Sequence, residues 1–418
     1  MPVDKTYEKE FRDSLAALPG GKAFRAVREK GLEGFLSLGG IPHARAEDWR
    51  YAPIGALRQA HIPRAAKGKT KTPAVKGVTG WPMAVLHNGA LVETPGIDGM
   101  EVLSSAEALP AWAAGFGAAG VEANPLERLN LALTDGGALV RVKKGVKAEG
   151  LEIVLINDGL KDSARHVRNL IVLEEGASLP VFIRTIAAGS SGWLNTVTHA
   201  RLAKGAALDL AADFEAAPGV LVSAVFAGDL KSKASLHYGT VAAGLSSLRH
   251  EAEVTLDGAE ACAHLAGGML AAENEALDFL TRLHHMKGGA TSAQAFKGVA
   301  AAKGKTAFQG RIVVEEQAQK TDARQNCHNL ILDRSGEANV KPELLIFADD
   351  VACAHGATVG EIDEAALFYI MQRGIPEEEA KGILVRAFLG DIVETFGNET
   401  LQEFFEAKIN AWMEKNSA

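Results

Sequence analysis

Short apolar segments that end in turn-forming residues constrain the fold of this chain more than any other feature. The clearest are LEIVLI, NLIVLE, PVFIRTI, VLVSAVF, RIVVE and NLILD, which lie between residues 151 and 333. Gly, Asp, Asn or Lys bounds each segment, as expected of β-strands separated by turns. Long amphipathic helical stretches are missing between them, which disfavours a sheet built from alternating strands and helices.

The turns also repeat one another. EEGASL, AKGAAL, KSKASL and LDGAEA align on Ala177, Ala206, Ala234 and Ala259, which are 29, 28 and 25 residues apart. A period in the twenties, with strands and without helices, predicts a parallel β-helix or a related solenoid. A twisted β-sandwich whose turns happen to be evenly spaced remains the alternative.

Helical patterns flank this β-rich core. Phe11, Leu15 and Leu18 have helical spacing, and the N-terminal part ends near EDWRYAPIGAL (47–57), followed by a basic linker (64–76). The chain is therefore expected to comprise an N-terminal helical region with linker (1–77), a β-helix core (78–360) and a C-terminal helical region (361–418).

The C-terminal region is predicted to contain three helices. The first, at residues 361–373, ends before Gly374, and Pro376 is suited to open the second. The last, about residues 399–413, carries an apolar stripe on one side. This stripe could pack on the chain's own core or dock a partner, and both interpretations stay open. Its members are Leu401, Phe404, Phe405, Ile409 and Trp412.

Composition excludes several classes of protein. The formal charge of −8 argues against a nucleic-acid binder, which needs a basic surface. No apolar run approaches the ~20 residues that span a bilayer. The N-terminus is polar and mixed in charge, unlike a secretory signal. Three cysteines are too few for a disulfide framework, so we expect a cytoplasmic protein.

Motifs of enzymes such as GxSxG, HExxH and Walker A are absent. Two Cys/His pairs have i, i+2 spacing, Cys262/His264 and Cys353/His355, which places both side chains of a pair on one face of a strand. Thiolate and imidazole suit iron or zinc, but two ligands do not complete a site, so a partner would supply the rest. The alternative is a buried cysteine beside a structural histidine, and we keep that interpretation for Cys262/His264.

The run from Gln325 to Phe388 resembles the SufB/SufD family of iron–sulfur cluster assembly proteins, on its SufD side. The features that carry the resemblance are NLIL, KPEL, the segment DDVACAHGATVG (349–360) and LFYIMQRG, together with EDWRYAPIGAL near the N-terminus. The resemblance implies a right-handed parallel β-helix flanked by helical ends. It also implies a non-catalytic scaffold that works with a SufB-like subunit and a SufC-like ABC ATPase.

The resemblance also implies site residues. His355 matches a histidine proposed to help build the nascent iron–sulfur cluster at the interface with SufB, and Cys353 matches the accompanying cysteine. The cluster would be transient and would not bind stably to this chain alone. The C-terminal helices would dock the ATPase, and the residues we expect at that contact are Phe368, Ile383, Leu384, Phe388, Phe404, Phe405 and Trp412.

One rival is a β-helix enzyme that acts on carbohydrates, such as a lyase or esterase. Asp349 and Asp350 are adjacent, so on a strand they cannot easily form a facing acid pair. Whether the chain pairs with a second copy of itself when its partner is missing is left open.

Overall fold

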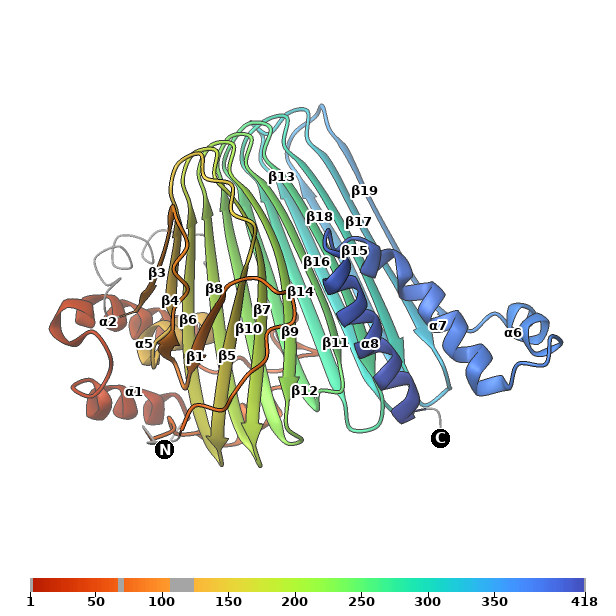
Figure 1. Ribbon diagram of the computed structural model, residues 1–418, viewed down its shortest axis with the longest axis horizontal. Coiled ribbons are helices and arrows are strands. Elements are labelled where there is room, and N and C mark those ends of the chain that lie inside the picture. Colours follow the sequence, from red (N-terminus) through yellow and green to blue (C-terminus); the bar gives the residue numbers. More distant parts are fainter. Residues whose placement is uncertain (1–2, 67–70, 106–123, 417–418) are drawn as a thin grey trace.

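A computed structural model describes residues 3–66, 71–105 and 124–416 and confirms the predicted parallel β-solenoid (Figure 1). From β4 onward, successive strands alternate between two sheets, which we name the odd sheet and the even sheet after their strands. The strands are β1 (Met83–His87), β2 (Ala90–Glu93), β3 (Met100–Ser104), β4 (Ala138–Val142), β5 (Leu151–Leu160), β6 (Ser163–Leu173), β7 (Ser178–Gly189), β8 (Gly192–Leu202), β9 (Ala207–Ala216), β10 (Val220–Leu230), β11 (Ser235–Ala243), β12 (Ser247–Leu256), β13 (Cys262–Ala271), β14 (Ala276–His285), β15 (Thr291–Ala300), β16 (Lys305–Val314), β17 (Asp322–Ile331), β18 (Glu337–Ile346) and β19 (Ala352–Glu361).

Helices lie at both ends of the solenoid (Figure 1). In the N-terminal part, α2 packs on α5, and α5 contacts β6 and β8 of the even sheet. The helical elements are α1 (Val3–Ser14), α2 (Gly21–Ser37), the 3-10 turn η1 (Glu47–Trp49), α3 (Gly55–Gln59), α5 (Pro125–Leu133), α6 (Glu364–Met371), α7 (Glu377–Glu394) and α8 (Glu399–Asn416). Part of the predicted basic linker, residues 67–70, lies outside the described residues.

Alanines mark the turns because stacked turns approach closely. Ala177, Ala206 and Ala234 are fully buried directly before β7, β9 and β11. The prediction that Ala259 is the equivalent alanine of the fourth turn is wrong. Ala261 takes that place, since it precedes β13 and the amide of Cys262 donates to the carbonyl of Ala234 at 2.9 Å. The hydrogen-bonded ladder between turns, more than the spacing of turn residues, sets the register.

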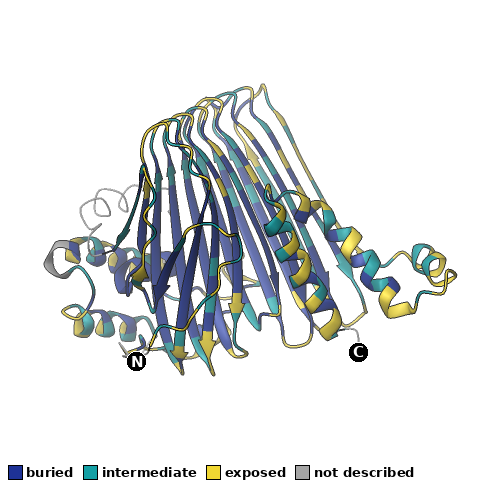
Figure 2. Ribbon diagram, viewed as in Figure 1, coloured by how far each residue is buried: buried dark blue, intermediate teal, exposed yellow. Residues whose placement is uncertain are grey.

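The interior between the sheets is apolar and aromatic. The rings of Phe226 and Tyr238 stack with their centroids 4.6 Å apart, and those of Phe296 and Phe308 stack at 4.5 Å. Burial is nearly continuous through the middle strands and declines in the last ones (Figure 2). The removal of these side chains from water makes the largest favourable contribution to the free energy of folding of such a stack.

The helices α7 and α8 cover part of the outer face of the odd sheet. The sequence leaves open whether the apolar stripe of α8 packs on the core or docks a partner. In the structure Leu401, Phe405, Ile409 and Trp412 are buried, and Phe405 packs on Phe182 of β7, whereas Phe404 is half-buried. The start of the first C-terminal helix was predicted at Glu361, and this is wrong. The chain stays in β19 through Glu361 because it pairs with β17, and α6 begins at Glu364, where Asp363 accepts hydrogen bonds from two backbone amides.

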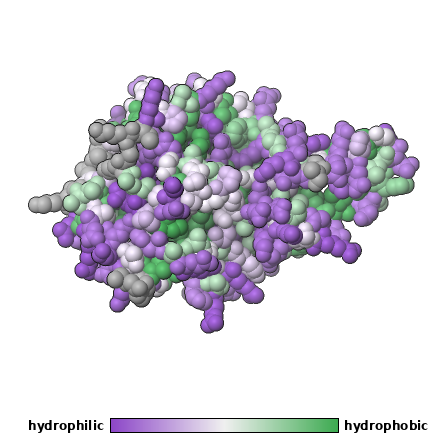
Figure 3. Space-filling model, turned by 90° about the horizontal axis from the view of Figure 1, so that it is seen from below, coloured by the Kyte–Doolittle hydropathy of each residue, from purple (hydrophilic) through white to green (hydrophobic). Residues whose placement is uncertain are grey.

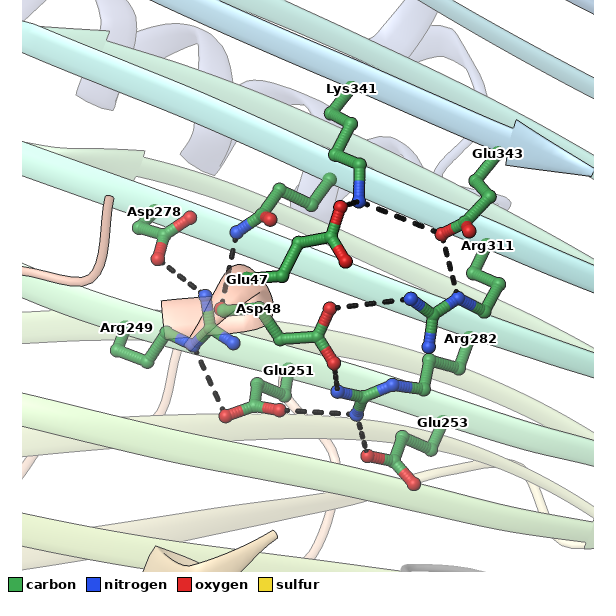
Figure 4. A network of polar contacts seen from close by, with 11 residues as sticks. Glu47, Asp48, Arg249, Glu251, Glu253, Asp278, Arg282, Arg311, Lys341 and Glu343 are labelled. Carbon is green, nitrogen blue, oxygen red and sulfur yellow. Dashed lines mark hydrogen bonds and ion pairs between the residues drawn. The ribbon is translucent and has the colours of Figure 1, made fainter. Parts of the chain in front are cut away.

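The EDW motif binds the outer face of the even sheet through a network of charges (Figure 4). Asp48 accepts from Arg282 of β14 at 2.7 Å and pairs with Arg311 of β16 at 3.5 Å. The Trp49 ring lies 4.6 Å below the guanidinium of Arg249. Burial works to raise the pKa of Asp48, but the nearby arginines outweigh it and the pKa falls below its ordinary value. The motif therefore joins the N-terminal region to strands far along the chain.

Asp48→Asn should destabilise the fold by about 1–3 kcal/mol, because it leaves two partly buried arginines without their shared carboxylate. Glu47→Gln is the matched control. Its side chain is 69% exposed and binds only Lys341 in this network, so we expect less than about 0.5 kcal/mol. Chemical unfolding of both variants checks this, and equal effects would contradict the central role of Asp48.

Candidate functional site

Among the residues that the structure describes, no further turn is stacked on the last turn of the solenoid. β19 ends the order of the odd sheet and β18 ends that of the even sheet, so each strand has one free edge. We refer to these two edges and the side chains facing inward beside them as the open end. Residues of both strands are mostly half-buried or exposed (Figure 2). Backbone groups and inward-facing side chains are therefore both available there.

Cys353 and His355 lie together on the inner face of β19. Cys353 is in register with Ala323 of β17, and His355 with Gln325, and both of these β17 residues are fully buried. Because side chains alternate along a strand, Cys353 and His355 share the inward face. His355 is nevertheless exposed and Cys353 half-buried, since no further turn covers them. The sequence placed the pair on one face correctly but could not tell which face.

The surroundings of Cys353 disfavour its thiolate form. Partial burial raises its pKa, while a hydrogen bond with the backbone of Ala323 works in the opposite direction. A metal ion would have to displace the proton, as thiol ligands normally require. Among the described residues, no group of three or more His, Cys, Asp or Glu side chains is arranged to hold a metal ion. The pair offers one soft sulfur and one imidazole nitrogen and no more.

A buried amide lies directly behind the histidine. Gln325 is completely buried, and neither its side-chain oxygen nor its nitrogen has a hydrogen-bond partner among the described residues. A Cβ built on Gly310 would lie 1.6 Å from its amide nitrogen, so the side chain fills the space left by that glycine. One strand further in, Gln294 is in register with Gln325 and accepts from Thr281 at 2.5 Å.

Sequence reasoning missed this amide. The neighbouring Cys327 and His328 lie on opposite faces of β17: Cys327 is buried, and His328 faces outward with its imidazole 2.8 Å from the hydroxyl of Thr358. The available signal was the alternation itself. Gln325 alternates with exposed residues in step with Ala323 and Cys327, which predicts that its polar side chain is buried.

The residues expected to contact a partner divide into three groups. Phe368 of α6 is 63% exposed. The half-buried ones are Ile383, Leu384 and Phe388 of α7 and Phe404 of α8. Phe405 and Trp412 are buried against the odd sheet, so they cannot touch a partner unless α8 leaves the sheet. Tyr369 and Met371 of α6, which we had not singled out, are exposed beside Phe368.

The other Cys/His pair lies away from the open end. Cys262 and His264 are on β13, which β15 and β17 separate from β19. Cys262 is half-buried and His264 exposed. Within the described ranges, no helix is long and apolar enough to cross a membrane.

Comparisons with known proteins bear on what this geometry does. The sequence model of the family described as "SUF system FeS cluster assembly, SufBD core domain" matches residues 155–388. The iron-sulfur cluster assembly protein SufD of Escherichia coli is 36% identical over 166 residues, 40% of this chain and 39% of that protein. SufD of Bacillus subtilis is 27% identical over 281 residues, 65% of this chain and 63% of that protein. The alignments thus span less than two thirds of either relative.

A third similar protein, ABCI7 of Arabidopsis thaliana, is described as chloroplastic. It is 33% identical over 158 residues, 37% of this chain and 33% of that protein. The family model includes every strand from β6 to β19 and the helices α6 and most of α7. The open end and the exposed side of α6 therefore both fall inside the matched part.

Gln325→Met should make the isolated chain more stable by about 1 kcal/mol, because it removes a buried amide that has no partner and keeps its length. Gln294→Met is the matched control and should be destabilising, because it leaves the buried hydroxyl of Thr281 without its hydrogen-bond acceptor. Urea unfolding of both variants measures this. A loss of stability in Gln325→Met would show that the amide is satisfied within the isolated fold.

Proposed function

Because this chain belongs to the SufBD core family of SUF system FeS cluster assembly, we propose that it is a scaffold subunit whose open end holds half of an assembly site. His355 and Cys353 supply two ligands for a nascent iron–sulfur cluster, and a second solenoid subunit of the SufB type supplies the others. The cluster is the cargo of this reaction. The observation that carries the proposal is a pair of inward-facing ligands exposed where the solenoid lacks its next turn.

A shared site suits the chemistry of assembly and release. An iron–sulfur cluster is usually held by four protein ligands, so a pair from one chain is incomplete. Two ligands on each side of an interface keep the cargo bound only while the subunits are joined. Movement of the subunits would then release it without breaking the fold of either.

The free edges supply the means of joining. β18 and β19 each present unpaired backbone donors and acceptors along one side, a template for pairing with another strand. Apolar side chains are exposed nearby, including Phe347 at 61% and Val359 at 49%. A partner solenoid with its own free edges would continue both sheets and cover these side chains. A second copy of this chain offers the same edges, so self-pairing is the expected competitor when the partner is missing.

The helix α6 is the part best placed to dock an ATPase of the SufC type. It has no buried residue, and it projects beyond the last strand (Figure 1). Phe368, Tyr369 and Met371 are exposed on it, and hydrophobic surface is visible at this projecting end (Figure 3). The half-buried Ile383, Leu384, Phe388 and Phe404 would add to the contact, while Phe405 and Trp412 hold the helices on the sheet.

His355→Ala should reduce cluster formation by the reconstituted complex at least about tenfold, since it removes one ligand. The readout is the visible absorbance of the cluster after anaerobic reconstitution with iron and sulfide. His328→Ala is the matched control, because His328 lies on the neighbouring strand and faces outward. Size-exclusion chromatography should show an intact complex for both variants, and a His355→Ala complex that assembles clusters at the normal yield would contradict the ligand role.

Phe368→Ser combined with Tyr369→Ser should raise the Kd for the ATPase subunit at least about tenfold, because exposed aromatic residues dominate such contacts. Both side chains are more than 60% exposed, so the unfolding midpoint should stay near wild type. Leu36→Ser, at an exposed apolar position of α2, should leave the affinity unchanged. Isothermal titration calorimetry measures the Kd of each variant for the ATPase subunit. An unchanged Kd for the double variant would show that α6 is not the docking surface.

A further inference from the structure

Cys262 and His264 form a thiol–imidazole pair on the outer surface of the odd sheet. They stand at the start of β13, two residues apart and therefore on the same face. Their neighbours Ala263 and Leu265 point into the core and are buried. Thr291 of β15 is in register with Cys262, and the side chains of Thr291 and His264 both act on the thiol. The thiol is half-buried and His264 is exposed, so small molecules can reach the sulfur.

The chain's three thiols differ in their environment. Cys327 is completely buried inside the solenoid, and burial raises its pKa to about 12. Burial also raises the pKa of Cys353. At Cys262 the hydrogen bond with His264 lowers the thiol pKa and outweighs partial burial, and the same hydrogen bond raises the pKa of His264. Cys262 is therefore the cysteine that faces outward from the solenoid, and it is also the one whose pKa is lowered.

We propose that Cys262 is the nucleophilic thiol of this chain, a modification site that exchanges with disulfides and carries the acquired thiol group as a mixed disulfide. The structural interpretation that the sequence favoured for this pair is thereby replaced. The inference does not depend on the proposed assembly function, since it concerns the isolated chain and a surface distant from the open end.

The exchange is balanced as a single substitution. The Cys262 thiolate attacks one sulfur of a disulfide RSSR, the Cys262–S bond forms, and the S–S bond of RSSR breaks. The leaving thiolate RS⁻ takes its proton from His264 or from water, and no external oxidant or reductant is needed. The electrophile is therefore a low-molecular-weight disulfide such as oxidised glutathione.

The product should persist until an external thiol removes it. A second cysteine beside Cys262 would resolve the mixed disulfide, but the other two lie on the inner faces of β17 and β19. Cys262 faces outward, so the added group extends into solvent and the solenoid need not open. The site is thus suited to reversible capping rather than to disulfide formation within the chain.

Charged and titratable groups from the neighbouring strands and turns surround the pair. His237 of β11 is in register with His264, but its imidazole is engaged 3.0 Å from a carboxylate oxygen of Asp209. Lys233 and Glu260 pair with each other in the adjacent turns at 3.7 Å. On the other side, Asp322 and Arg324 of β17 bind each other at 3.1 Å. Each of these groups is engaged with its own partner, so His264 is the group that lowers the pKa of the Cys262 thiol.

The test measures the reaction of the folded wild-type chain with an aromatic disulfide and with oxidised glutathione, followed by peptide mass spectrometry. We expect one adduct, on Cys262, and a rate that titrates below the ordinary cysteine pKa of about 8.5. Cys262→Ser should abolish the adduct, and Cys353→Ser, the matched control, should react at the wild-type rate.

His264→Gln should slow the reaction several-fold at pH 7, because the imidazole that lowers the thiol pKa is removed and less of Cys262 is then present as thiolate. The deficit should shrink above pH 9, where the thiol ionises without help, whereas a merely structural defect would slow the reaction at every pH. Faster labelling of Cys353 than of Cys262 would overturn the proposal. So would a wild-type rate that titrates at or above the ordinary cysteine pKa, or an unchanged rate in a His264→Gln chain that is folded by circular dichroism.

Discussion

The parallel, in-register hydrogen bonding of each turn on the previous one is the constraint on which the rest of this structure depends. It fixes which side chains point inward, and it lets one turn cover the inner face of its neighbours. Tyr238, Phe296 and Phe308 are buried because strands continue on both sides of them. Where the stacking stops, at β18 and β19, inward-facing residues meet solvent without any change in their own backbone conformation. The candidate site is thus made by termination of a repeat rather than by a special loop.

Much of the core could be predicted because repeated units repeat their local signals. Each apolar segment overlaps a strand, and Ala177, Ala206 and Ala234 mark equivalent turns. Errors arose where two signals of similar strength competed. Ala259 and Ala261 are both small residues in one turn, and only pairing of β11 with β13 distinguishes them. Glu361 begins a plausible helical pattern, but pairing with β17 keeps it in a strand.

The candidate site was half predictable for a related reason. Spacing alone put Cys353 and His355 on one face of a strand. It could not show that this face points inward, or that Gln325 lies buried behind His355, because both depend on which strands become neighbours. The stripe on α8 was recognised, but whether it meets a partner or the chain's own sheet is decided by tertiary packing. On α6, the resemblance named Phe368 as a contact residue, but no pattern indicated the exposed Tyr369 and Met371, because a short helix with no buried residue shows no apolar stripe.

The contact between the EDW motif and the even sheet also orders events in time. Glu47 and its partner Lys341 on β18 are 294 residues apart in the chain. At about 5–20 residues per second, synthesis of that interval takes on the order of 15–60 s. During this delay the N-terminal segment has left the ribosome without the arginines and lysine that will bind it. Closure of the network is therefore a late step, and it requires that β18, the last strand of the even sheet, has been made.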